Sequence, residues 1–110
     1  MNCEINDSAD TAIIVLSGDI DLDTSSQVRG ALLDCVSLKG TVIVDLAAVS
    51  YIDSTGVASL VEAFQIARKS ETRFALAAVS EAAMRVLELA RLNKVFSIYP
   101  TVADGLNNGP

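Results

Sequence analysis

The side chains best suited to chemistry lie in the middle of the chain, in the run Asp53, Ser54, Thr55 and Gly56. The run follows a buried-looking strand and opens a helix-period pattern of apolar residues. At such a place, carboxylates and hydroxyls accept hydrogen bonds from the free N–H groups of the first helical turn. The positive end of the helix dipole also favours anions there. The two hydroxyls are therefore either helix caps or acceptors for a phosphate, and capping is the simpler interpretation.

Ser54 also occupies the position of a serine nucleophile, between a strand and a helix. However, Ile52 stands where a nucleophile elbow requires glycine. The chain contains no histidine, so the usual general base of a serine hydrolase and the commonest transition-metal ligand are both missing. Nothing in the sequence places a lysine base near Ser54. We therefore predict that the chain is not an enzyme.

A second candidate site is the acidic loop that contains Asp19, Asp21 and Asp23. Their alternate spacing copies the first three ligand positions of a calcium-binding loop. The copy then fails, because Thr24 replaces the required glycine and Gly30 replaces the bidentate glutamate. We therefore predict no metal site. The acids form either a solvated loop before a helix N-terminus or a docking surface for a cationic partner.

Composition limits the function classes further. With 110 residues, 51% of them hydrophobic, the chain is predicted to form one domain, residues 1–110, with a substantial core. The net charge of −6 and the absence of a Lys/Arg cluster argue against direct binding to nucleic acid or to an anionic membrane surface. No apolar run is long enough for membrane insertion and no signal peptide is recognisable, so we expect a cytoplasmic protein. Cys3 and Cys35 are expected to be reduced structural thiols.

Alternating strands and helices must position these side chains. Thr11–Ser17 is apolar at consecutive positions, which predicts a strand buried on both faces, and Gly18–Thr24 is expected to be a loop. Thr24 and Gln27 have the spacing of a capping box at the start of the next helix. The expected strands are Cys3–Asn6, Thr11–Ser17, Thr41–Leu46, Thr72–Ala78 and Val95–Tyr99, and the expected helices are Thr24 to about Lys39, about Ser54 to Lys69, Ser80 to about Ala90 and a short turn from Pro100 to Leu106.

The resulting order is β-β-α-β-α-β-α-β-α. It begins with a hairpin and continues with alternating elements, which requires crossovers and parallel pairing. The predicted fold class is therefore α/β, a mixed β-sheet with helices packed on it. A frayed tail is expected at about residues 107–110.

Three stretches resemble one protein family. Val49–Val57, which contains Tyr-Ile-Asp-Ser-Thr-Gly-Val, resembles the signature of the STAS superfamily, specifically of the bacterial anti-sigma-factor antagonists. Gly18–Asp21 resembles the family's loop after its second strand, and Leu87–Phe96 resembles its late helix and the turn into its last strand. The stretches occur in the family's order and cover nearly the whole chain. The resemblance implies a STAS-like mixed β-sheet.

In this family the antagonist binds an anti-sigma factor that is itself an ATP-dependent serine kinase of the GHKL type, and so frees the sigma factor. The resemblance implies that this kinase phosphorylates Ser54, with Thr55 the less favoured acceptor, and that Asp21 lies beside the modified serine. The phosphorylated form cannot bind, and a PP2C-like phosphatase resets it. No cofactor is implied, since ATP enters only through the kinase. The implied partner surface joins both candidate sites: Asp19, Asp21, Asp23, Thr24, Asp53, Ser54, Thr55 and Gly56.

Two departures from the family pattern leave an alternative open. Ala58 stands where the antagonists often have glycine, and Ala78–Glu81 replaces a Gly-Pro-like loop. Alanine at the former position also occurs in the small cytoplasmic STAS subunit of bacterial lipid-trafficking ABC transporters. A regulatory subunit docked on an ABC ATPase is therefore the second functional hypothesis.

Overall fold

Five strands form one mixed sheet in residues 1–107, which are the residues that the computed structural model describes. The elements in chain order are β1 Asn2–Ser8, β2 Thr11–Ile20, α1 Ser25–Leu38, β3 Thr41–Ile52, α2 Ser54–Lys69, β4 Arg73–Ala77, α3 Glu81–Leu89, β5 Ser97–Tyr99 and α4 Val102–Asn107. The strands lie in the order β1-β2-β3-β4-β5, with β1 and β2 antiparallel and the other neighbours parallel. The predicted hairpin and mixed α/β fold are confirmed. Of the predicted tail, Asn107 ends α4, and residues 108–110 lie outside the described range.

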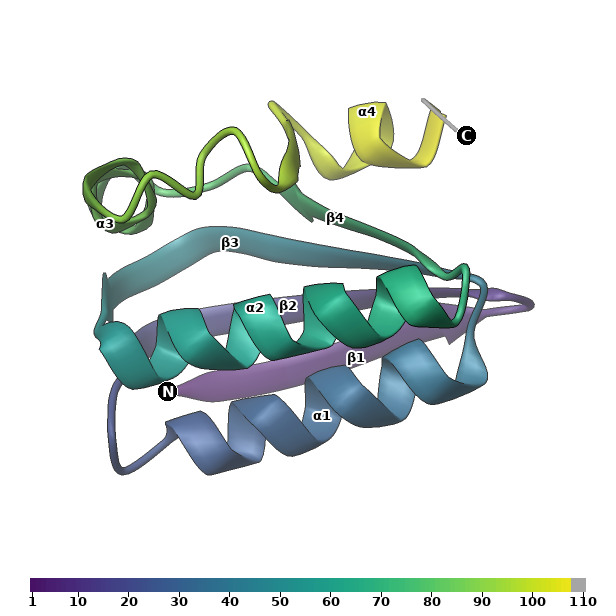
Figure 1. Ribbon diagram of the computed structural model, residues 1–110, viewed down its shortest axis with the longest axis horizontal. Helices are drawn as coiled ribbons and strands as arrows, with labels where there is room; N and C mark the ends of the chain where they lie inside the picture. Colours follow the sequence, from purple (N-terminus) through teal and green to yellow (C-terminus); the bar gives the residue numbers. More distant parts are fainter. Residues whose placement is uncertain (108–110) are drawn as a thin grey trace.

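Helices cover the two faces of the sheet unequally (Figure 1). Helices α1 and α2 lie side by side on one face, and α3 also contributes to that layer: Leu32, Leu60 and Leu87, one from each helix, belong to the same core. On the opposite face α4 packs beside a smaller core around Ile43 and Ala75. No helix in the described part of the chain is both long and apolar enough to cross a membrane.

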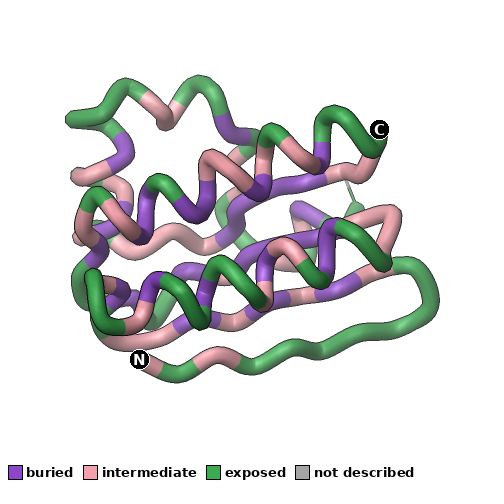
Figure 2. The backbone as a smooth tube through the Cα atoms, turned by 60° about the horizontal axis from the view of Figure 1, so that its bottom comes forward, coloured by how far each residue is buried: buried purple, intermediate pink, exposed green. Residues whose placement is uncertain are grey.

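The prediction that β2 is buried on both faces is wrong. Ala12, Ile14 and Leu16 are fully buried under the α1–α2 layer, whereas Ile13 and Val15 on the opposite face are only half-buried. The contacts of α4 are with β3, β4 and β5, so its cover is centred away from β2. The neighbouring edge strand β1 is mostly exposed (Figure 2). A consecutive apolar run therefore marks a strand with one covered face and one partly covered face.

Strands β2 and β3 both extend further than predicted. Gly18–Ile20, expected in a loop, continue β2, and β3 continues to Ile52. Ile20 pairs with Ile52 after two shifts in register, and Gly18, at one of these shifts, has a φ of 80° that favours glycine. The composition of this segment is turn-like, but pairing with β3 keeps it extended. The two parallel strands consequently end at the same edge of the sheet.

The N-termini of the helices show which of the predicted helix starts and caps are correct. Helix α2 has the predicted bounds Ser54–Lys69. Ser80 caps α3 as predicted, because its hydroxyl oxygen accepts a hydrogen bond from a first-turn N–H at 3.2 Å. The predicted capping box of Thr24 and Gln27 is wrong, since the Thr24 side chain makes no cap hydrogen bond to α1. Its hydroxyl instead donates to the Asp19 carbonyl oxygen at 3.1 Å, within the loop before the helix.

Candidate functional site

Asp53 builds the turn between β3 and α2. It is the N-cap of α2, and its Oδ1 accepts hydrogen bonds from the N–H groups of Thr55 and Gly56 at 2.9 and 3.2 Å and from the Thr55 hydroxyl at 2.5 Å. The Thr55 hydroxyl, and then the N–H groups of Gly56, Thr55 and Leu22, hold the pKa of the Asp53 carboxyl below its ordinary value, against the opposing effect of desolvation. The carboxyl is therefore ionised at neutral pH and fixes the first turn of α2.

Asp53 also joins the acidic loop to α2. Its backbone N–H donates to the carbonyl oxygen of Ile20, the last residue of β2, at 3.0 Å. The backbone N–H of Leu22, in the loop between β2 and α1, contributes to lowering the pKa of the Asp53 carboxyl. Because β2 and β3 end at the same edge of the sheet, the structure brings together the two candidate sites that the sequence leaves separate.

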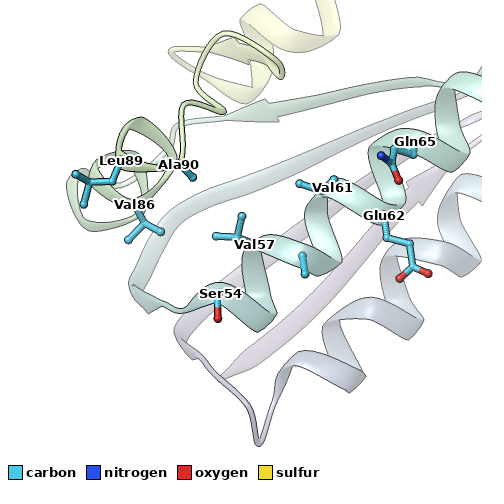
Figure 3. Close-up of a pocket in the computed structure, with 9 residues that line it drawn as sticks. Ser54, Val57, Val61, Glu62, Gln65, Val86, Leu89 and Ala90 are labelled. Carbon is cyan, nitrogen blue, oxygen red and sulfur yellow. The ribbon is translucent and has the colours of Figure 1, made fainter.

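The two adjacent hydroxyls have different surroundings. Ser54 is exposed as the first residue of α2, and within the described residues its hydroxyl has no hydrogen-bond partner. Figure 3 shows the Ser54 oxygen pointing away from α3. Thr55 is half-buried, and its hydroxyl proton is donated to Asp53. Ser54 is therefore the more accessible acceptor for an enzyme that approaches from solvent.

Gly56 lies beneath this turn and is buried. A Cβ added at Gly56 would lie 2.7 Å from side-chain carbons of both Ile20 and Ile52, at the ends of β2 and β3. These isoleucines are buried and stiff at χ1, so neither can move aside easily. Gly56, predicted to be part of the partner surface, therefore lets α2 begin close to the sheet.

Asp21 and Thr24 are used to build the acidic loop. Oδ1 of Asp21 accepts hydrogen bonds from the Asp23 N–H at 3.0 Å and the Thr24 hydroxyl at 3.3 Å, while Thr24 Oγ1 accepts the Asp21 N–H at 2.9 Å. Asp19 and Asp23 are exposed, and so is Leu22, which sequence reasoning missed and whose exposed fraction is 74%. No group of three or more potential metal ligands occurs in residues 1–107. The loop thus presents exposed acids around one exposed apolar side chain.

Sequence reasoning also missed an open groove between α2 and α3, with a volume of about 580 Å³ (Figure 3). Ser54 lies at its N-terminal end along α2, and the groove walls are mainly apolar: Val57, Ala58, Val61, Val86, Leu89 and Ala90. Helical periodicity assigns several of these residues to the core, because a sequence does not show how far apart two helices pack. The one sequence feature that indicates the groove is Leu89, an apolar residue outside the apolar stripe of α3. In the structure its exposed fraction is 81%.

Comparison with known proteins assigns this chain to a protein family. The family model described as the STAS domain matches residues 2–105. The anti-sigma-B factor antagonist of Listeria monocytogenes is 34% identical over 86 residues, which cover 77% of this chain and 75% of the relative. The crystal structure of an anti-sigma factor antagonist from Mycobacterium paratuberculosis is 28% identical, with a TM-score of 0.85 over 96% of this chain and 91% of that chain.

The same fold also occurs in another functional setting. A sulfate transporter family protein from Wolinella succinogenes is 19% identical, with a TM-score of 0.77 over 91% of this chain and 84% of that chain. At that identity the similarity shows the fold alone. The family match over nearly the whole chain and the Listeria relative give the assignment. The chain belongs to the STAS domain family, and its predicted resemblance to the anti-sigma-factor antagonists of that family is confirmed.

Proposed function

We propose that this chain is an anti-sigma-factor antagonist that binds a serine-kinase anti-sigma factor while Ser54 is unmodified and is released when that kinase phosphorylates Ser54. The observation that carries the proposal is the exposed Ser54 hydroxyl, which lies at the start of α2 between the acidic loop and the apolar groove. The antagonists from Listeria and Mycobacterium support the functional class. A PP2C-like phosphatase reverses the modification, and ATP enters only through the kinase.

A phosphate on Ser54 is compatible with the fold. The hydrogen bonds that fix the first turn of α2 are made by Asp53, Thr55 and Gly56, and none uses the Ser54 side chain. The phosphate adds a charge of about −1.5 to −2, which is favourable at a helix N-terminus. The modified protein therefore stays folded, and the effect of the phosphate falls on the binding of the partner.

The surface around Ser54 explains how a phosphate prevents binding. On one side lie the exposed Leu22 and the acids of its loop, and on the other lies the apolar groove with Leu89 at its surface. A partner that covers both sides removes the Ser54 side chain from water. Burial of an unpaired phosphate in an apolar contact, beside the carboxylate of Asp53, carries a large desolvation and repulsion penalty.

Affinity capture from a lysate of the source organism tests the proposal. Immobilised wild-type protein and Ser54→Ala should retain a GHKL-type kinase, and Ser54→Asp should retain little of it. If the two variants bind the kinase equally, the switch at Ser54 is excluded. Capture of an ABC ATPase in place of the kinase would contradict the proposal and support the transporter-subunit hypothesis.

The modification itself is tested with the captured kinase and ATP. Mass spectrometry should locate one phosphate on Ser54, and a PP2C-type phosphatase should remove it and restore binding. Ser26→Ala is a matched control, because Ser26 is another exposed serine in the first turn of a helix, α1, and its loss should not change phosphate incorporation. Phosphate found only on Thr55 would refute the assignment.

A further inference from the structure

Two hydroxyls stand next to each other at the start of α2, and a kinase that reaches one is close to the other. We propose that Asp53 selects between them: by holding the Thr55 hydroxyl it confines phosphoryl transfer to Ser54, and it is therefore the residue that determines the site of modification. This inference rests on the proposed function and adds a specificity-determining residue to it. Asp53 acts here as a positioning residue, because it does not touch the reacting phosphate.

The hydrogen bonds of the turn treat the hydroxyls of Thr55 and Ser54 differently. Thr55 Oγ1 donates to Asp53 Oδ1 at 2.5 Å, and the same carboxylate oxygen also accepts the N–H groups of Thr55 and Gly56. To attack a phosphorus atom, the Thr55 oxygen has to turn away from Asp53 and lose this charge-assisted bond. Ser54 has no such bond to lose within the described residues.

Phosphoryl transfer also requires a base that takes the proton from the acceptor hydroxyl. The acceptor oxygen forms a bond to the γ-phosphorus of ATP while the bond from that phosphorus to ADP breaks, and the hydroxyl proton passes to a base of the kinase. Asp53 is a poor substitute for that base at Thr55, because the hydrogen bonds it accepts lower its pKa. The Thr55 hydroxyl is therefore held by Asp53 rather than activated.

The product of phosphorylation at Thr55 would be less stable than the product at Ser54. A phosphate on Thr55 would replace the hydrogen bond to Asp53 with two adjacent negative groups. Repulsion would also move the Asp53 carboxylate away from the N–H groups of Thr55 and Gly56 and so weaken the cap of α2. A phosphate on Ser54 leaves every one of these hydrogen bonds in place. Both the reaction and its product therefore favour Ser54.

The test uses the kinase captured with the Ser54→Ala protein, ATP, and site mapping by mass spectrometry. A serine acceptor at position 55 removes any preference of the kinase for serine over threonine. The double variant Ser54→Ala/Thr55→Ser should take little phosphate, because Asp53 still holds the hydroxyl. Adding Asp53→Ala should raise the rate of phosphorylation at position 55 by about tenfold or more, as expected for release of a hydrogen bond to a charged acceptor.

Two matched variants separate this role from a general effect on structure. Asp53→Asn, in the same double variant, keeps an accepting oxygen and should keep the hydroxyl masked. Asp53→Gly removes the oxygen but is a favoured N-cap residue, and it replaces Asp53→Ala if the alanine variant does not fold. A purely structural role of Asp53 would lower phosphorylation at Ser54 in the single Asp53→Ala variant without moving any phosphate to Thr55.

The outcomes distinguish the inference from the proposed function. If the wild-type protein takes no phosphate, the proposed function fails and the inference fails with it. If the wild-type protein is phosphorylated on Ser54, the inference is overturned by either of two results. One is rapid phosphorylation of position 55 while Asp53 is present, and the other is no phosphorylation there after Asp53 is removed from a folded variant.

Discussion

Helices α1 and α2 begin at the same edge of the sheet, and their N-termini are built differently. Asp53 precedes α2 and binds N–H groups of its first turn, so the start of this helix is fixed. Thr24 precedes α1 but makes no cap hydrogen bond, and its hydroxyl is used within the loop before the helix. Residues of the capping type therefore bind whichever backbone groups the tertiary structure brings near. At α2 they hold a helix, and at α1 they hold a loop.

Exchange of one glycine in each helix tests this difference with the largest expected effect. Gly56→Ala should lower the free energy of unfolding by about 1–3 kcal/mol, because the new methyl group overlaps two buried isoleucines. Gly30→Ala in α1 is the matched control: nothing lies within 4 Å of the added Cβ, so the change should stabilise the protein by about 0.5–1 kcal/mol. Urea denaturation measures both. Similar changes in the two variants would remove the distinction between the helices.

Removal of the polar residue before each helix is the second test. Thr24→Ala should lower the free energy of unfolding by about 0.5–1.5 kcal/mol, since its hydroxyl makes hydrogen bonds within a partly exposed loop. Asp53→Ala should lower the midpoint of urea denaturation further, because several hydrogen bonds end on its carboxylate. Asp53→Asn should lie between Asp53→Ala and the wild type. An equal or larger loss for Thr24→Ala would show that α2 does not depend on its cap.

Acidification is the third test, and it acts on α2 through Asp53. The folded state holds the Asp53 pKa below its ordinary value of 3.8, so the resulting stabilisation is complete above that pH and is lost as the pH falls through the folded-state pKa. Thermal melts of the wild type and Asp53→Asn should therefore differ at pH 7, and the difference should shrink as the pH is lowered below 3.8. The other acids are common to both proteins and do not affect the comparison. A difference that stays constant across this range would contradict the role of the ionised carboxylate.

Phosphorylation of Ser54 should have the smallest effect on stability. The modified residue lies at the helix end whose dipole favours anions, and its side chain has no role in the cap. The melting temperature of the phosphorylated protein should lie within about 4 °C of the unmodified protein, which corresponds to about 0.5–1 kcal/mol in a domain of this size. A large drop on phosphorylation would mean that the switch acts by unfolding the domain.

The sequence predicts most of the fold because many of its signals are local. The bounds of α2 follow from the apolar period after Ser54, and the cap of α3 follows from Ser80 and its own first turn. The end of β2 is missed because Gly18 and Asp19 are typical of a turn, whereas pairing with β3 is a contact between distant segments. The bond between Thr24 and the Asp19 carbonyl depends on that same pairing.

The candidate site is predictable to a smaller extent. The run around Asp53 and Ser54 is visible in the sequence, and so is the acidic loop. Their junction through the hydrogen bond from Asp53 to Ile20 is not, because it depends on two parallel strands that end together. The groove beside Ser54 is hidden for a similar reason: it results from the spacing of α2 and α3, which no periodicity reports.

The hydrogen bond between Asp53 and Ile20 has a consequence for the rate at which a bound partner dissociates. The backbone hydrogen bond from Asp53 to the carbonyl oxygen of Ile20 ties the start of α2 to the end of β2, where the acidic loop begins. A partner that docks there orders only side chains such as Leu22 and Leu89, at about 0.5–1.5 kcal/mol each, and leaves the backbone unchanged. Substitutions that weaken this connection between β2 and α2 should therefore shorten the residence time of the complex, while the association rate changes little.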